Sequence, residues 1–200
     1  MQQYSTCNMF FAVDTETTGL IDAKPIEIAI VNLENVSFNM CERICTHAGL
    51  ITPEAFSVHH ISSDMLLGCK SELEVMTLFI DFIVSNAPLK EPIVLVAHNA
   101  NFDKGVIERA LFRCDLVLPS NVTWQCTQKM SIDMGNARGR GKNTLEACCK
   151  REGIEYVNAH SALPDAIMCG RLFTQFMSKL KLNDTNVANA LLLLGLASCK

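Results

Sequence analysis

A short apolar segment that ends in acidic residues is the feature that most limits how this chain folds. Residues 9–14 read Met-Phe-Phe-Ala-Val-Asp, and Thr-Glu-Thr-Thr-Gly follows at 15–19. A short apolar segment bounded by a turn signal is typical of a buried strand. Side chains two positions apart in a strand share one face. The segment therefore predicts a core strand that carries Asp14 and Glu16 on one face at its carboxyl end.

Further strands and helices alternate along the chain. Short apolar segments typical of strands are 26–33, 93–97, 121–126 and, more weakly, 36–46. Helical spacing or capping residues predict helices over 54–58, after 62–64, from Ser71 to before Pro88, and over 101–113, 143–151 and 162–180. Strands separated by helices predict an α/β fold with a mixed β-sheet flanked by helices. No internal repeat or linker is found, so one domain is expected over 1–182, followed by an apolar helical tail over 183–200.

The composition is that of a globular protein, but the charge does not identify a partner. Apolar residues make up 49% of the chain, charged residues make up 19%, and the net charge is −4. A protein that binds nucleic acid through a broad basic face is normally basic. Either nucleic acid is not the partner, or it is held locally while bound metal offsets the carboxylates.

The cysteines and the tail both favour a cytoplasmic protein. The ten cysteines form no CxxC pair, most lie in apolar segments, and no secretory signal precedes the first strand, so we expect them to be reduced. Cys41 and Cys45 lack the further ligands of a zinc site. The apolar part of the tail, 187–197, is about half the roughly 20 residues of a membrane span, so a packed helix is expected.

Four carboxylates lie at the ends of predicted elements, which favours a metal site. Asp14 and Glu16 place two like charges together, and a divalent cation would relieve their repulsion. Oxygen ligands alone favour Mg²⁺ or Mn²⁺ over zinc. Asp103 and Asp165 lie in predicted first turns of helices, where the helix dipole by itself also explains an acid. His160 precedes Asp165 by five residues and fits either a general base or a surface histidine.

Three motifs resemble those of a known enzyme family. Residues 14–19 read Asp-Thr-Glu-Thr-Thr-Gly, residues 98–103 read His-Asn-Ala-Asn-Phe-Asp, and residues 160–166 read His-Ser-Ala-Leu-Pro-Asp-Ala. In this order they resemble the exonuclease motifs of the DEDDh superfamily, and especially the proofreading (epsilon) subunits of bacterial DNA polymerase III. Lesser similarities lie around Glu27, in 53–61 and in 143–154. The five-residue spacing from His160 to Asp165 distinguishes this branch from the one with a tyrosine four residues before the last aspartate.

The resemblance implies a ribonuclease-H-like fold and a 3′→5′ exonuclease that uses two divalent cations, Mg²⁺ or Mn²⁺. Asp14, Glu16 and Asp165 would bind the first ion, and Asp14 with Asp103 the second. His160 would be the general base. Single-stranded 3′ ends, DNA in preference to RNA, would be the substrate, and mononucleotides the product. The residues implied for substrate binding are Thr17, Thr18, Gly19, Val58, His59, Asn99 and Phe102.

Two features depart from the family pattern, and two other functions stay open. His60 stands where the family has glycine, which affects the expected fit of the substrate. No recognisable polymerase- or clamp-binding segment follows residue 180, so membership of a replication complex is not expected. The alternatives are an RNA-trimming exonuclease of the same branch and a non-catalytic nucleic-acid-binding module. The basic loop 138–142 would either guide a nucleic-acid backbone or be solvated.

Overall fold

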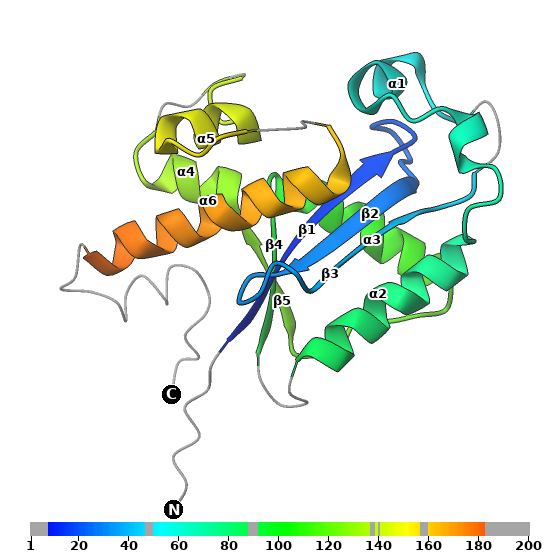
Figure 1. Ribbon diagram of the computed structural model, residues 1–200, viewed down its shortest axis with the longest axis horizontal. Coiled ribbons are helices and arrows are strands. Elements are labelled where there is room, and N and C mark those ends of the chain that lie inside the picture. Colours follow the sequence, from blue (N-terminus) through cyan, green and yellow to red (C-terminus); the bar gives the residue numbers. More distant parts are fainter. Residues whose placement is uncertain are drawn as a thin grey trace, which may run out of the picture.

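The fold is built on one five-stranded sheet (Figure 1). The structure is a computed structural model that describes residues 8–46, 50–87, 92–136, 139, 141–156 and 160–182. The strands are β1 (Met9–Thr17), β2 (Pro25–Asn32), β3 (Asn39–Arg43), β4 (Ile93–Ala97) and β5 (Val122–Cys126), in the order β3-β2-β1-β4-β5. β1, β2 and β3 pair antiparallel, whereas β4 and β5 run parallel to β1. The predicted mixed sheet is thus confirmed, with β1 at its centre.

Helices cover both faces of this sheet. They are α1 (Pro53–His59), the 3₁₀ helix η1 (Ser63–Leu66), α2 (Glu72–Asn86), α3 (Ala100–Arg113), α4 (Thr127–Asp133), α5 (Leu145–Glu152) and α6 (Ala162–Leu182). Only α4 was not predicted. It follows β5 directly, and its N-cap is Cys126, whose sulfur accepts from the backbone N–H of Lys129. The N-cap position itself holds none of the preferred capping residues, and Thr127, the first helical residue, directly follows the strand, so the sequence pattern does not separate the helix from β5.

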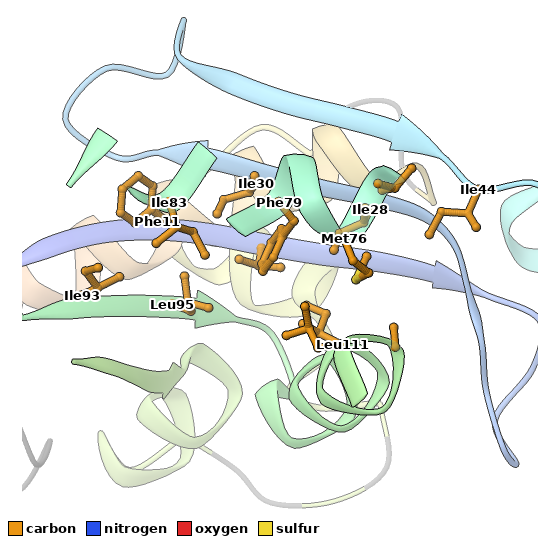
Figure 2. Close-up of a cluster of buried hydrophobic side chains, with 14 of the residues drawn as sticks. Phe11, Ile28, Ile30, Ile44, Met76, Phe79, Ile83, Ile93, Leu95 and Leu111 are labelled. Carbon is orange, nitrogen blue, oxygen red and sulfur yellow. The ribbon is translucent and has the colours of Figure 1, made fainter. Parts of the chain in front are cut away.

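The core lies on the two faces of the sheet. Phe11 and Val13 of β1 point to the face covered by α2 and α3, where Phe79 and Leu111 complete a buried cluster (Figure 2). The intervening Ala12 belongs to a second cluster on the face covered by α6. Side chains alternate along a strand, so Asp14 and Glu16 point to the face of α6.

A close approach between β1 and α6 sets the position of the last helix. A Cβ atom added at Gly170 of α6 would lie 3.3 Å from Cβ of Ala12 and would also meet the side chain of Leu33. Small residues on both elements therefore let the helix backbone lie close to the central strand. The first turn of α6 comes to the carboxyl end of β1 as a result (Figure 1).

The described residues also bear on the redox state of the thiols and on a membrane span. Every cysteine in the described part of the chain is free, as expected for reduced thiols. Within the described ranges, no helix has the length and apolar character needed to span a membrane. The apolar tail 183–200 and residues 138 and 140 of the basic loop lie outside the described residues, so the predictions for the tail and the loop remain predictions.

Candidate active site

Three of the predicted acids converge at the carboxyl end of β1. Asp14 and Glu16 come from β1, and Asp165 comes from the first turn of α6. One carboxylate oxygen from each residue lies within 4.8 Å of an oxygen from the other two. Residues that are distant in the sequence thus form a group of oxygen ligands that fits one divalent cation.

The carboxylate of Asp165 is held from two sides. The hydroxyl of Tyr156 donates to Oδ1 at 3.0 Å, and the backbone N–H of His160 donates to Oδ2 at 3.2 Å. His160 is exposed and has a left-handed backbone, with φ of 65°. Its backbone contact places His160 beside the acid group. The role of Tyr156 was not predicted, because it lies outside the three motifs.

Asp103, in the first turn of α3, contacts the same strand through Thr15. Its Oδ1 accepts two hydrogen bonds from Thr15, one from the backbone N–H at 3.1 Å and one from the hydroxyl at 2.8 Å. Thr15 lies between Asp14 and Glu16, and its side chain points to the face of α3. Asp103 is buried, with 3% of its surface exposed, and is not one of the three acids whose oxygens converge. It is therefore fixed next to the group without being part of it.

The four carboxyl groups have raised pKa values because they are buried close to one another. Burial is the main cause of the pKa of Asp14 lying well above its usual value, and the charges of Asp103, Glu16 and Asp165 add to it. Burial, followed by the charge of Asp165, raises the pKa of Glu16 to about 7. Burial also raises the pKa of Asp103 to about 7 and raises the pKa of Asp165. A divalent cation would offset this concentration of negative charge.

A fifth acid, Glu27, lies next to this group but has its own partners. Glu27 is directly opposite Glu16 in the β1–β2 ladder. Its Oε1 accepts from Nε of Arg43 at 2.9 Å, and its Oε2 accepts from the backbone N–H of Ala162 at 3.0 Å. The sequence placed Glu27 in the second strand without a role. A buried acid in a strand that is apolar on both faces is the signal that could have found it.

The predicted substrate residues at the end of β1 and just after it form a tight turn against α1. The backbone N–H of Thr52, the N-cap of α1, donates to the carbonyl of Thr18 at 2.8 Å. A Cβ atom at Gly19 would lie 3.0 Å from Cγ2 of Thr52, so the glycine permits this close approach. The hydroxyl of Thr17 donates to the carbonyl of Gly19 at 2.8 Å. Thr17, Thr18 and Gly19 are buried, so a ligand would contact mainly their backbone atoms.

His59 links α1 to the same turn. Its Nδ1 accepts from the backbone N–H of Ile61 at 2.9 Å, which leaves Nε2 to donate to the carbonyl of Thr17 at 3.2 Å. Burial lowers the pKa of His59, in keeping with a neutral ring. Both ring nitrogens of His59 are thus hydrogen-bonded within the protein, and the ring holds the Thr17–Gly19 turn against α1.

The remaining predicted substrate residues are more open. Val58 is 46% exposed on α1. Asn99 is exposed and has left-handed backbone angles at the N-cap of α3, a conformation that asparagine tolerates better than most residues. Phe102, one turn into α3, is partly buried.

Two further exposed residues in this region were missed by the sequence reasoning. Leu20 and Ile21 follow Gly19 and are 84% and 89% exposed. Two adjacent apolar residues directly after an acid motif were the available signal, because apolar side chains grouped on a surface can mark a contact site.

Comparison with known proteins identifies the family. The family described as Exonuclease (RNase_T) matches residues 11–173. The chain belongs to this exonuclease family. It is 31% identical over 175 residues to DNA polymerase III subunit epsilon of Treponema pallidum (strain Nichols), covering 84% of this chain and 76% of that protein. It is 29% identical over 172 residues to the epsilon subunit of Buchnera aphidicola subsp. Acyrthosiphon pisum (strain APS), covering 80% and 69%. The predicted resemblance to epsilon subunits is confirmed.

Solved structures of exonucleases share the fold of this family member. Exonuclease X in complex with 5′ overhanging duplex DNA superposes with a TM-score of 0.62 at 23% identity, over 86% of this chain and 92% of that one. The nuclease domain of 3'hExo, a DEDDh family member bound to rAMP, gives a TM-score of 0.70 at 14% identity, over 90% and 95%. The predicted ribonuclease-H-like fold is thus confirmed. The prediction of an enzyme is also confirmed, and the acid cluster fits the metal dependence expected for it.

Proposed function

We propose that this protein is a 3′→5′ exonuclease that removes nucleotides from single-stranded DNA ends with two divalent cations. The observation that carries the proposal is the convergence of the Asp14, Glu16 and Asp165 carboxylates. The backbone N–H of His160 donates a hydrogen bond to the Asp165 carboxylate. Acids gathered in this way lower their mutual repulsion by binding cations.

The chain offers ligands for both ions. Asp14, Glu16 and Asp165 would hold the first, and Asp14 together with Asp103 the second. Mg²⁺ and Mn²⁺ both suit these oxygen ligands. When bound, a pair of ions about 4 Å apart stabilises charge on the attacking and leaving oxygens of an in-line displacement at phosphorus. The contact from Thr15 to Asp103 would keep that carboxylate oriented between turnovers.

His160 would take the proton from the attacking water. The residue is exposed, so its ring has access to a water and to solvent, and its backbone N–H is bonded to Asp165. A general base of this kind contributes about 10²–10⁴-fold to the rate. Replacement of His160 by glutamine is therefore expected to lower kcat by about that factor while Mn²⁺ binding is retained.

The surface around the acid group suits a single-stranded 3′ end. Thr17, Thr18 and Gly19 would lie against the terminal nucleotide through their backbone. Aromatic side chains stack on bases without regard to sequence, and Phe102 would serve in this way. The exposed aliphatic side chains of Leu20, Ile21 and Val58 would add apolar contacts, with Asn99 and His59 also lining the nucleotide. DNA is favoured as the substrate because the relatives named above are DNA polymerase III subunits.

Digestion of labelled strands tests the polarity, the polymer and the metal together. Single- and double-stranded DNA and single-stranded RNA, each labelled at the 5′ end, are incubated with Mg²⁺, with Mn²⁺ or with EDTA. We expect the single-stranded DNA to shorten stepwise from its 3′ end with either ion and to stay intact in EDTA. Faster cleavage of RNA than of DNA would instead identify an RNA-trimming enzyme.

Two matched variants connect that activity to the site. Asp14→Asn removes one charge from the acid group and is expected to abolish cleavage. Asp81→Asn makes the same change on the exposed surface of α2 and is expected to leave cleavage unchanged. The proposal fails if the wild-type protein releases no mononucleotides with either ion, or if the 5′ label is released first.

A further inference from the structure

Tyr156 connects the packed helices to the acid group. Its hydroxyl donates to Oδ1 of Asp165 at 3.0 Å. The side chain is partly buried, and the ring packs against the apolar cluster that includes Cys148 and Cys149 of α5 and Leu172 of α6. Packing therefore fixes the ring, and a fixed ring gives the hydroxyl a defined direction.

This contact restricts the orientation of the Asp165 carboxylate. Oδ1 receives the Tyr156 hydroxyl and Oδ2 receives the N–H of His160, so rotation of the carboxylate would break a hydrogen bond. Each carboxylate oxygen can accept about two hydrogen bonds or ligand bonds. An oxygen of Asp165 can therefore accept its hydrogen bond and still bind a cation. In the structure, one Asp165 oxygen lies close to a carboxylate oxygen of Asp14 and to one of Glu16 while the bonds from Tyr156 and His160 are both made.

We infer that Tyr156 is a positioning residue for divalent-metal binding, acting through the carboxylate of Asp165. The inference rests on the proposed metal role of the acid group. Tyr156 belongs to none of the three sequence motifs, and the position four residues before Asp165 is occupied by Ser161. Groups that hydrogen-bond to metal ligands typically change metal affinity or activity about 10–100-fold when they are removed.

The test is a Mn²⁺ titration of the full chain, followed by electron paramagnetic resonance of free Mn²⁺. Tyr156→Phe keeps the packed ring and removes only the hydroxyl. We expect its Mn²⁺ dissociation constant to rise about 10-fold or more. The Mn²⁺ concentration for half-maximal cleavage should rise in parallel, with the KM for the oligonucleotide unchanged. A purely structural role would not shift metal affinity while leaving substrate affinity intact.

Two further variants keep the test decisive. Ser178→Ala removes a hydroxyl that donates to the carbonyl of Thr174 on the exposed side of α6, and should leave Mn²⁺ binding unchanged. Tyr156→Leu also lacks the hydroxyl but packs differently, so it should weaken Mn²⁺ binding as Tyr156→Phe does. Unchanged affinity in Tyr156→Phe, or an equal loss in Ser178→Ala, overturns the inference. If the wild-type protein itself binds no Mn²⁺ and cleaves no strand, the proposed function fails instead.

Discussion

Glu27 in β2 accepts a hydrogen bond from the backbone N–H of Ala162 in the first turn of α6, with 3.0 Å between Oε2 and N. The hydroxyl of Ser161 donates to the same oxygen at 3.3 Å. Ser161 and Ala162 lie between His160 and Asp165. Glu27 thus ties the segment that carries both residues to the sheet that carries Asp14 and Glu16.

Replacement of Glu27 by alanine should lower the free energy of unfolding and the rate of cleavage. The change leaves the Ala162 N–H and the Arg43 guanidinium without this acceptor, and a buried group that loses its partner costs about 1–3 kcal/mol. Urea unfolding measures the loss of stability. Glu42→Ala is the control, because Glu42 of β3 pairs with the exposed side chain of Lys70, and such surface pairs contribute about 0–1 kcal/mol. Equal losses in the two variants would show that Glu27 has no special role.

Divalent metal should stabilise the wild-type protein and not Asp14→Asn. A ligand that binds only the folded state at about 100 times its dissociation constant raises the free energy of unfolding by about 2.7 kcal/mol. Thermal unfolding with and without Mn²⁺ measures this gain. The exposed-surface variant Asp81→Asn should retain the full gain. A gain in Asp14→Asn as large as in the wild-type protein would contradict a metal site at Asp14.

The stability of the metal-free protein should fall as the pH rises. The pKa of Asp14 lies well above its usual value because of burial and the neighbouring acids, so the folded state keeps a proton that the unfolded state releases. A group of this kind contributes stability below its unfolded pKa of about 4, and the contribution is lost as the pH rises through the raised folded value. Glu16, whose pKa is raised to about 7 by burial and by the charge of Asp165, acts in the same direction.

Urea unfolding in EDTA at about pH 5 and about pH 8 tests this expectation. Asp14→Asn cannot ionise, and it also relieves the charge on its neighbours. Its free energy of unfolding should therefore fall less than that of the wild-type protein over the same interval. Parallel changes in the two proteins would show that Asp14 does not titrate as its surroundings require.

His60→Gly should stabilise the protein. His60 is the C-cap of α1, with φ of 56° and ψ of 19°, and its N–H donates to the carbonyl of Phe56 at 2.9 Å. Left-handed angles cost a non-glycine residue about 1 kcal/mol, and glycine is the usual residue at such helix ends.

The expected gain of about 1 kcal/mol corresponds to a rise of about 2–4 °C in Tm for a chain of this size. Thermal unfolding in EDTA measures it without interference from metal binding. His60→Ala also removes the ring but keeps a Cβ atom, so it should show no such gain. If the alanine variant were as stable as the glycine variant, the cost would not lie in the backbone.

Local pattern accounts for most of the elements. The apolar segment before Asp14 predicted β1, and the capping residues Ser71 and Thr144 lie at the starts of α2 and α5. These signals depend on neighbouring residues only, so they can be read from a single sequence. Helix α4 shows the limit, because its N-cap is a cysteine and no local signal separates it from β5.

By itself the sequence determined that two acids share one face of a core strand, and that two more begin helices. Which carboxylates converge was decided only by the tertiary structure. The close approach at Gly170 brings α6, and with it Asp165, to the end of β1, whereas Thr15 holds Asp103 beside the same strand. The contacts of Glu27 and Tyr156 were decided in the same way. Such contacts depend on strand order and on the distance between packed backbones, and no local pattern in the chain records either.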